Sequence, residues 1–203
     1  MKLYGAPNPA PNPRRVRIFL AEKGVDLPET RIDMMKREHK SEEFRARNPL
    51  GQIPTLELDD GTCISETVAI CRYFDEVHPE PPMFGRTAVE KALVDQWIRR
   101  VEFVAMMPVG NFWRHAHPRT AALLTQYKDF GESNRETFSG AQRFFDRALK
   151  DREFLALDTL TMADICLQTT VDFADWIGLP CDPELKSLAA WRERLAARPS
   201  ASA

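Results

Sequence analysis

The chain has 203 residues, of which 43% are hydrophobic and 29% charged, and its formal net charge at pH 7 is −2. These values are ordinary for a globular protein, and they give no electrostatic reason to expect nucleic acid or an anionic membrane as a partner. The length suits one large domain or two small ones. We interpret the basic cluster Arg14, Arg15 and Arg17 as one solvated helix face.

No apolar run approaches the ~20 residues needed to span a bilayer. The first residues lack the long apolar region of a secretory signal, so we expect a cytoplasmic protein. The cysteines form no C-x-x-C pair and have no nearby His cluster, which argues against a metal site and against a thioredoxin-like dithiol. We expect buried, reduced thiols that behave as small hydrophobes; they are Cys63, Cys71, Cys166 and Cys181.

The first part of the chain alternates between predicted strands and helices. A short strand at residues 2–4 is followed by a Pro-rich loop and by a helix for which Gly24 is the expected C-cap. Further strands are predicted from strand-like composition and from the hairpin signal Asp59-Asp60-Gly61. The remaining predicted elements are strands at 30–34, 53–58 and 62–65 and a helix at 66–77.

The second part is predicted to be entirely helical. The segment His78–Pro82 cannot be helical and is interpreted as a linker. Thr161 and Asp164 have the spacing of a capping box, and Pro183 is expected just inside the start of the last helix. The predicted helices cover residues 87–107, 134–150, 161–176 and 183–197.

Three motifs resemble those of one family, the cytosolic glutathione transferases. They are Asn48-Pro49-Leu50-Gly51-Gln52-Ile53-Pro54-Thr55-Leu56, then Glu66-Thr67-Val68-Ala69-Ile70, and much later Thr161-Met162-Ala163-Asp164-Ile165. The resemblance covers nearly the whole chain. It implies an α/β, thioredoxin-like domain over residues 1–80 and an all-α helical bundle domain over residues 87–203.

The resemblance implies how glutathione is bound as co-substrate. In the family the proline of Ile53-Pro54 is cis, and Ile53 would pair its backbone with the cysteinyl unit of glutathione, a form of strand addition. Thr67 at a helix N-terminus would hold the γ-glutamyl carboxylate, and Glu66 would hold the ammonium. The alternatives are a tight turn without a ligand, and a helix that Thr67 or Ser65 simply caps.

The glycine end of glutathione is assigned to a stretch that resembles the phi and theta classes. His39 or Lys40 would neutralise its carboxylate, and Gln52 offers matching amide chemistry. The alternative is that these side chains are only solvated.

The run Asn8-Pro9-Ala10-Pro11-Asn12-Pro13-Arg14-Arg15 stands where the family keeps its reactive group, yet it contains no hydroxyl or thiol. The position of the family's Ser or Cys falls on Ala10. The loop is closest to the bacterial Nu-class transferases, and Asn12 falls on their asparagine. We therefore expect the Asn12 amide to stabilise the glutathione thiolate. Tyr4 is a rival donor, and Asn12 can alternatively only shape a turn.

The resemblance places the second substrate against the first long helix of the second domain. The candidate lining is Met106, Met107, Phe112 and Trp113, and Pro108 and Gly110 are expected to bend or end the helix there. The same residues at helical spacing can instead be ordinary core. His115 and His117 lie nearby without a predicted role.

The resulting expectation is a glutathione S-transferase that conjugates glutathione to a small apolar electrophile, without a metal. Nu-type disulfide reduction and a non-catalytic binding or interaction module remain as alternatives. A homodimer is implied by the resemblance alone.

Overall fold

The computed structural model describes residues 1–203, which form two compact units. The first comprises Met1–Met83 together with Pro199–Ala203, and the second comprises Phe84–Arg198. The predicted sequence of an α/β part followed by an all-helical part is confirmed. The structure adds that the last five residues join the first unit, although they follow the helical part in the chain.

A four-stranded mixed sheet forms the centre of the first unit, in the order β2-β1-β3-β4. Strand β1 (Lys2–Gly5) runs parallel to β2 (Glu29–Arg31) and antiparallel to β3 (Thr55–Glu57). Strand β3 also pairs antiparallel with β4 (Cys63–Ser65), to which the predicted Asp59–Gly61 hairpin leads. All four strands are shorter than or similar to their predicted lengths.

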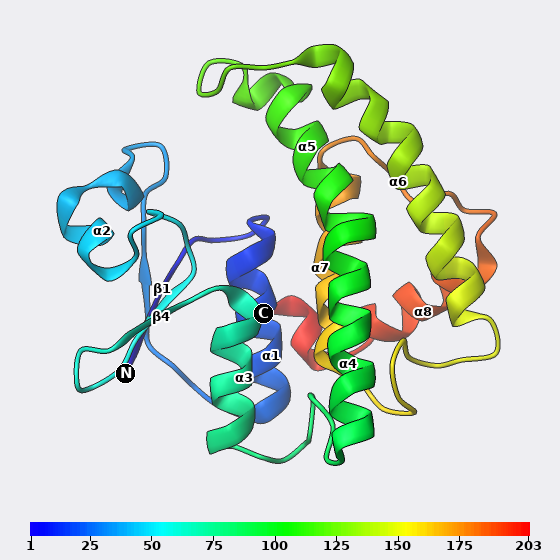
Figure 1. Cartoon of the computed structure of the whole chain (residues 1–203), viewed down its shortest axis with the longest axis horizontal. Helices are drawn as coiled ribbons and strands as arrows, with labels where there is room; N and C mark the ends of the chain where they lie inside the picture. Colours follow the sequence, from blue (N-terminus) through cyan, green and yellow to red (C-terminus); the bar gives the residue numbers. More distant parts are fainter. The chain divides into compact units, whose positions relative to one another are not determined.

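Helices lie on both faces of this sheet. Helix α1 (Pro11–Lys23) and α3 (Thr67–Val77) pack against each other on one face, and the short α2 (Glu42–Arg47) lies on the other (Figure 1). Successive strand residues point to opposite faces, so Leu3 faces the α1 and α3 layer while Tyr4 meets Phe44 of α2. The interior residues of the α1 and α3 layer are fully buried and include Val16, Phe19, Ile70 and Phe74.

Helix α1 starts earlier than its apolar pattern suggests. It begins at Pro11, inside the run expected to be loop, and it ends as predicted at Gly24, which has a left-handed φ of 65°. Two prolines in the first turn favour this start, because their φ is already helical and the first turn needs few N–H donors. The N-cap residue Ala10 provides no side-chain hydrogen bond.

A buried lysine anchors the segment that follows α3. The Nζ of Lys23 pairs with the Asp75 carboxylate at 2.5 Å, and its side chain is fully buried. The same ammonium donates to the carbonyl oxygens of His78 and Pro81. The non-helical segment predicted at His78–Pro82 is therefore held to the end of α1.

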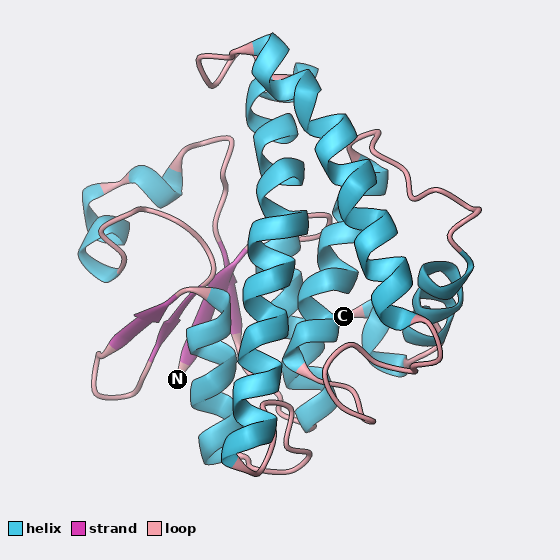
Figure 2. Ribbon diagram, turned by 45° about the vertical axis from the view of Figure 1, so that its right-hand side comes forward, coloured by secondary structure: helices cyan, strands magenta, loops and turns pink.

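The second unit consists of helices packed side by side (Figure 2). They are α4 (Ala88–Arg100), α5 (Met107–His115), α6 (Lys128–Leu149), α7 (Met162–Trp176) and α8 (Lys186–Ala196). Helices α5 and α6 approach closely at Gly131, where an added Cβ would lie 2.7 Å from Ala116. Helix α7 is the most buried, with Met162, Ile165 and Cys166 fully enclosed.

The expectation that Pro108 and Gly110 end the helix is wrong. A π-helical segment, Val101–Met106, joins α4 to α5, and the backbone at both junctions stays in the right-handed helical region. A proline cannot donate to the carbonyl four residues earlier. The wider π turn, in which the Met107 N–H donates to the Glu102 carbonyl oxygen, sits immediately before the proline and lets the helix continue.

The two predicted helix starts of the last part have different outcomes. At the start of α7 the Asp164 carboxylate accepts from the N–H and the hydroxyl of Thr161, so the capping box is confirmed. The placement of Pro183 inside the last helix is wrong, because α8 begins at Lys186. Asp182 forms a turn over this stretch by accepting from the Glu184 N–H at 2.9 Å.

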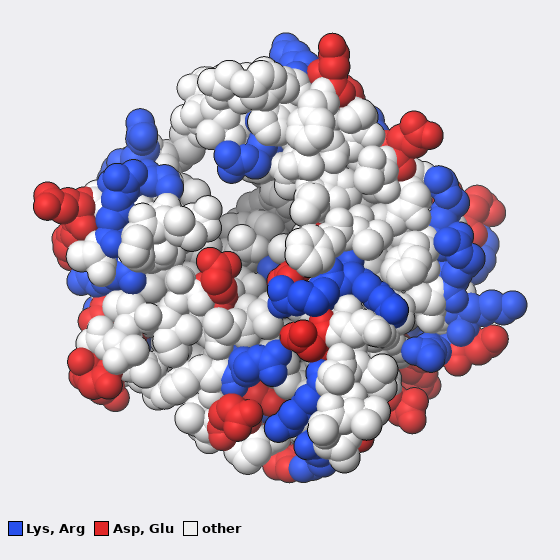
Figure 3. Space-filling view, in the orientation of Figure 1, with Lys and Arg blue, Asp and Glu red and all other residues white.

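The surface carries interspersed charges of both signs, and the visible face in Figure 3 has no single basic patch. No helix combines the length and the apolar character that crossing a membrane requires. All four cysteines are free; Cys71 and Cys166 are buried, whereas Cys63 and Cys181 are partly exposed. Burial raises the pKa of the Cys181 thiol to about 11, so this thiol stays protonated at neutral pH.

Candidate functional site

An unpaired stretch of backbone lies just before β3. The Ile53–Pro54 peptide is cis, and the Ile53 side chain is buried in a small cluster with Tyr4 and Phe44. Ala10, from the start of α1, packs against the same cluster. Neither the N–H nor the C=O of Ile53 bonds another group of the chain. An extended ligand can therefore pair with this residue as an added strand would.

The turn that precedes Ile53 is braced from within. The buried Asn48 side chain donates to the Gln52 carbonyl oxygen at 2.8 Å and accepts from the Leu50 N–H at 3.1 Å. Gly51 has a φ of 56°, and an added Cβ there would lie 2.4 Å from the His39 carbonyl oxygen, so only glycine fits. The Gln52 side chain is exposed and bonds no other group of the chain.

The residues predicted for the glycine end of the ligand lie against this turn. The Nζ of Lys40 donates to the carbonyl oxygens of Leu50 at 3.0 Å and Gly51 at 2.8 Å. His39 has a buried Nδ1 without a partner. Its pKa is lowered by burial first and then by the charges of Lys40 and Arg37. Lys40 thus braces the turn, and His39 is held towards its neutral form.

The N-terminus of α3 is open. Glu66 is its N-cap residue and has a φ of 71°, which non-glycine residues rarely adopt, and it makes no side-chain cap. Ser65 belongs to β4 and does not cap either. The first three N–H groups of the helix, those of residues 67–69, donate to no group of the chain. Strained backbone and unused donors together are typical of a ligand site.

Arg15 connects the two helix starts. Its Nη1 donates at 3.2 Å to the Asn12 Oδ1 and at 3.2 Å to the Thr67 hydroxyl oxygen. Arg15 is only 1% exposed, so its assignment to a solvated face is wrong. The sequence did not predict that Arg15 is buried and bridges two helix starts, because an arginine in a basic run is usually solvated. The spacing of three residues between Asn12 and Arg15 was the available signal.

Asn12 is the second residue of α1 and is exposed. Because Arg15 binds its amide oxygen, the Nδ2 group is left to donate elsewhere, and it bonds nothing within the chain. Pro11 and Pro13 have no N–H. The Asn12 N–H is therefore the one free main-chain donor of the first turn, since the Arg14 N–H already bonds the Ala10 carbonyl oxygen. Both available donors at this helix start belong to one residue.

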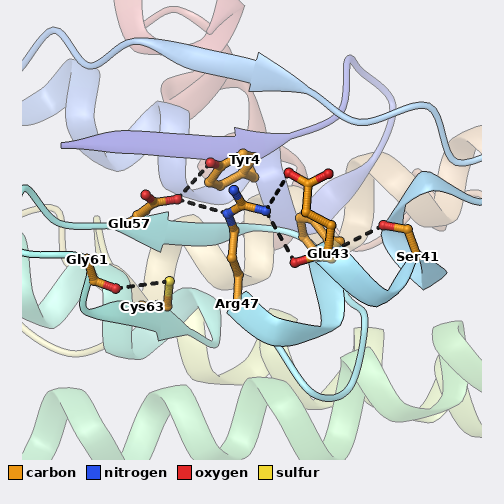
Figure 4. Close-up of polar contacts among 8 residues, drawn as sticks. Tyr4, Ser41, Glu43, Arg47, Glu57, Gly61 and Cys63 are labelled. Atoms are coloured by element: carbon orange, nitrogen blue, oxygen red, sulfur yellow. Dashed lines mark hydrogen bonds and ion pairs between the residues drawn. The ribbon is translucent and has the colours of Figure 1, made fainter.

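Tyr4 is engaged elsewhere. Its hydroxyl donates to the Glu57 Oε2 at 2.7 Å, and the Arg47 Nε donates to the same oxygen at 3.0 Å (Figure 4). The Tyr4 hydroxyl bond, followed by the Arg47 bond, lowers the pKa of Glu57. The Arg47 guanidinium also lies 5.1 Å from the Tyr4 ring centroid. This network fastens α2 to the sheet, so the geometry gives no support to Tyr4 as a thiolate donor.

In the helical unit the four predicted lining residues are divided between core and surface. Phe112 is 2% exposed and belongs to the core, whereas Met107 is 50% exposed. Met106 and Trp113 are partly exposed and lie seven residues apart, on one side of the helix. Gly110 lies between them, and an added Cβ there would meet nothing within 4 Å. The side of α5 with Met106 and Trp113 thus has an open gap at its centre.

An aromatic cluster adjoins this side of α5. The Trp113 ring centroid lies 4.7 Å from that of His117, 5.4 Å from Phe173 and 5.7 Å from Trp176. Burial, and then the charge of Arg119, lowers the pKa of His117. His115 instead contacts Tyr127 and Phe130, and its buried Nδ1 has no partner. No group of three His, Cys, Asp or Glu side chains converges anywhere in the chain.

Known proteins resemble this chain over its whole length. Residues 10–77 match the family profile described as "Glutathione S-transferase, N-terminal domain", and residues 114–199 match that of the C-terminal domain. Glutathione S-transferase 2 of Saccharomyces cerevisiae is 37% identical, over 98% of this chain and 87% of the relative.

Solved structures agree with these matches. A glutathione S-transferase domain-containing protein of Marinobacter aquaeolei VT8 has a TM-score of 0.92 at 38% identity, over 98% of this chain and 99% of the other. The crystal structure of Gtt2 from Saccharomyces cerevisiae has a TM-score of 0.92 at 36% identity, over 100% and 99% of the two chains.

Proposed function

Because the chain belongs to the glutathione S-transferase family, we propose that it binds glutathione, stabilises its thiolate through Asn12 and transfers it to a small apolar electrophile. The observation that carries this proposal is the double hydrogen bond of Arg15, at 3.2 Å to Asn12 and 3.2 Å to Thr67. The buried guanidinium of Arg15 thereby fixes the position of Asn12, the proposed thiolate donor, relative to Thr67, the proposed anchor of the ligand carboxylate.

The three parts of glutathione fit three features of the first unit. The γ-glutamyl carboxylate binds the free N–H groups at the start of α3, beside Thr67, and Glu66 accepts from the ammonium. The cysteinyl unit pairs with the free backbone of Ile53, ahead of the cis Pro54. Gln52, with its exposed amide, and His39 and Lys40 receive the glycine end. The position of the Lys40 ammonium is set by its hydrogen bonds to the carbonyl oxygens of Leu50 and Gly51.

Asn12 can supply enough stabilisation for the thiolate. A hydrogen bond to a charged group contributes roughly 1.5–3 kcal/mol. This corresponds to a fall of about one to two units in the thiol pKa. The enzyme needs no nucleophile of its own, because glutathione provides the thiol and the protein holds it ionised and oriented. The buried positive charge of Arg15 favours the thiolate in the same direction.

The second substrate is an apolar electrophile that contacts the helical unit. Met106, Met107 and Trp113 offer soft, adaptable apolar surface, and the gap at Gly110 leaves room between them. Phe112 is left out, because it is buried in the core.

A second candidate reaction is glutathione-dependent reduction of small disulfides. The asparagine loop, which resembles that of the bacterial Nu class, favours it. This reaction consumes two glutathione molecules and yields oxidised glutathione, whereas conjugation consumes one. Product analysis with a small disulfide and with an apolar electrophile distinguishes the two reactions.

We also infer that two copies of the chain pair through α4 and the π-helical segment. Large apolar side chains are exposed there at helical spacing: Val89 at 68%, Leu93 at 38% and Phe103 at 60%. A solvent-facing stripe of this kind marks a protein interface.

The proposal is tested by titrating the thiol of bound glutathione, with the ultraviolet absorbance of the thiolate as readout. We expect a thiol pKa clearly below that of free glutathione in the wild type. It should rise by roughly one to two units in Asn12→Ala. Asn12→Asp should raise it further, because a carboxylate repels the thiolate. A wild-type protein that binds glutathione without lowering its thiol pKa would contradict the proposal and favour a non-catalytic binding module.

A further inference from the structure

The residues Pro199–Ala203, which we call the 199–203 strap, lie along α1 in the first unit (Figure 1). The Ser200 side chain is buried and its hydroxyl donates to the Glu22 carboxylate. The Arg14 Nη2 donates to the Ala201 carbonyl oxygen at 3.0 Å. The Asn8 Nδ2 donates to the Ala203 oxygen at 3.4 Å. From Ser200 to Ala203, successive strap residues contact first the end of α1, then its start, and then the loop that precedes α1.

That loop has little internal support. Residues 7–9 are exposed, and the one backbone hydrogen bond within the loop joins the Ala10 N–H to the Pro7 carbonyl oxygen at 3.3 Å. The helix that follows begins without a side-chain cap, although capping side chains typically contribute about 1 kcal/mol. The loop therefore depends on contacts from outside itself.

Asn8 is where these outside contacts meet. Its Oδ1 accepts from the Arg17 Nη2 at 2.5 Å while its Nδ2 reaches Ala203. The Arg17 guanidinium also donates to the Ala6 carbonyl oxygen at 3.0 Å and pairs with Glu29 at 3.3 Å. One side-chain amide thus joins the strap to a guanidinium that is itself bonded to Ala6, the residue after β1, and to Glu29 of β2.

We propose that the 199–203 strap holds the loop before α1 and so fixes Asn12 against the bound glutathione thiol, with Asn8 as the positioning residue that joins strap and loop. The inference rests on the proposed role of Asn12. Two strap anchors, Asn8 and Arg14, flank Asn12 in the sequence, so losing the strap loosens the chain on both sides of it. A hydrogen bond to a thiolate weakens steeply when its donor is misaligned.

The test compares wild type, a variant lacking residues 199–203, Asn8→Ala and the two changes combined. Ser202→Ala is the matched control, because the Ser202 hydroxyl bonds only within the strap, to Pro199. For each protein, the thiol pKa of bound glutathione is titrated and the glutathione Kd is measured by calorimetry. Asn8→Ala is informative even if the deletion variant does not fold, since Asn8 is exposed.

We expect the deletion and Asn8→Ala each to raise the bound thiol pKa by roughly half a unit, about a threefold change in the ionisation constant. The Kd should change by less than about twofold. The combined variant should raise the thiol pKa by less than the sum of the two single changes, because both of them remove the bond between Asn8 and Ala203. A purely structural strap would lower stability and leave the thiol pKa unchanged, which overturns the inference, as do fully additive changes. A wild type that does not lower the thiol pKa overturns the proposed function as well.

Discussion

Single residues in this protein combine backbone strain with an expected ligand contact, and Glu66 is the clearest case. Its φ of 71° is a backbone conformation that glycine adopts without strain and that residues with a side chain rarely adopt. Such a conformation costs of order 1–3 kcal/mol and persists where the surroundings impose it. The fold itself has no visible need for a carboxylate there, since Glu66 makes no cap. We therefore attribute the acidic residue to its proposed contact with the ligand ammonium.

Glu66→Gly should separate these two properties. Relief of strain should raise the free energy of unfolding by about 1 kcal/mol. Loss of the ammonium contact, worth roughly 1.5–3 kcal/mol, should weaken glutathione binding about tenfold or more. Urea unfolding and calorimetric titration measure the two effects. Asp151→Gly is the control, because Asp151 also has a positive φ of 61° but lies in the helical unit. An unchanged Kd in Glu66→Gly would refute the assigned contact.

The buried Asp164 illustrates a residue whose role is structural. Its carboxylate accepts from the Leu155 N–H at 2.9 Å, from Thr161, and from the Trp191 Nε1 at 3.1 Å. Burial nevertheless raises the pKa of this carboxyl group, with the hydrogen bonds opposing the rise. The side chain thus joins α7, the segment before it and α8.

Asp164→Ala should be strongly destabilising. Several buried donors would lose their acceptor, each at a cost of about 1–3 kcal/mol, so the free energy of unfolding should fall by roughly 3 kcal/mol or more. Asp158→Ala, at an exposed position of the same unit, should change it by less than about 0.5 kcal/mol. Chemical unfolding of the two variants provides the comparison, and similar values for both would contradict the assigned role.

At the scale of elements, two helical glycines have no packing reason to be glycine. An added Cβ would meet nothing within 4 Å at Gly110, and only the tip of Arg143 at 3.9 Å at Gly140. Gly131 is different, because an added Cβ would lie 2.7 Å from Ala116 in the crossing of α5 with α6. A glycine inside a helix costs roughly 0.5–1 kcal/mol relative to alanine.

Gly110→Ala and Gly140→Ala should therefore both stabilise the protein, by roughly 0.5–1 kcal/mol each. Only Gly110→Ala should also change substrate choice, because the gap it fills lies between Met106 and Trp113. The ratio of kcat/KM for a bulky over a compact electrophile should fall about tenfold. Equal ratios in the two variants would exclude this side of α5 as the electrophile site.

The elements also show what sequence patterns can and cannot predict. Apolar periodicity, the Asp59–Gly61 hairpin and the Gly24 cap predicted the four strands and most of the helices. The short helix α2 was not predicted, and α6 begins at Lys128 rather than at residue 134. Two further errors concern proline. Local rules state that Pro108 has no N–H for a helical hydrogen bond. They do not predict that the π-helical segment just before Pro108 lets the helix continue without that bond. Likewise Pro183 could begin a helix, yet the turn formed by Asp182 delays α8 to Lys186.

The candidate site was predictable where motifs are local and unpredictable where it depends on contacts distant in sequence. The unpaired backbone of Ile53 and the open start of α3 follow from short motifs. The link from Arg15 to Thr67 spans 52 positions of the sequence, and no local pattern encodes it. For the same reason the engagement of Tyr4 with Glu57 could not be foreseen, and a tyrosine at the end of a strand remained a rival donor.

At the scale of the whole molecule, the proposed pairing of two copies has a direct test. Phe103→Glu places a charge in the exposed stripe of α4 and the π-helical segment and should convert a dimer into monomers at micromolar concentration. Leu123→Glu is the control, since Leu123 is equally exposed, at 61% against 60% for Phe103, but lies outside the stripe. Sedimentation velocity gives the masses. A dimer that survives Phe103→Glu would exclude this stripe as the interface.

The prolines on either side of Asn12 have a consequence for how this protein can change over evolutionary time. They leave a single free main-chain donor in the first turn of α1, and it belongs to residue 12 whatever side chain that residue carries, proline excepted. A mutation at this position therefore alters one of two donors and leaves the other in place. Position 12 can therefore change between side-chain chemistries without passing through a state devoid of donors.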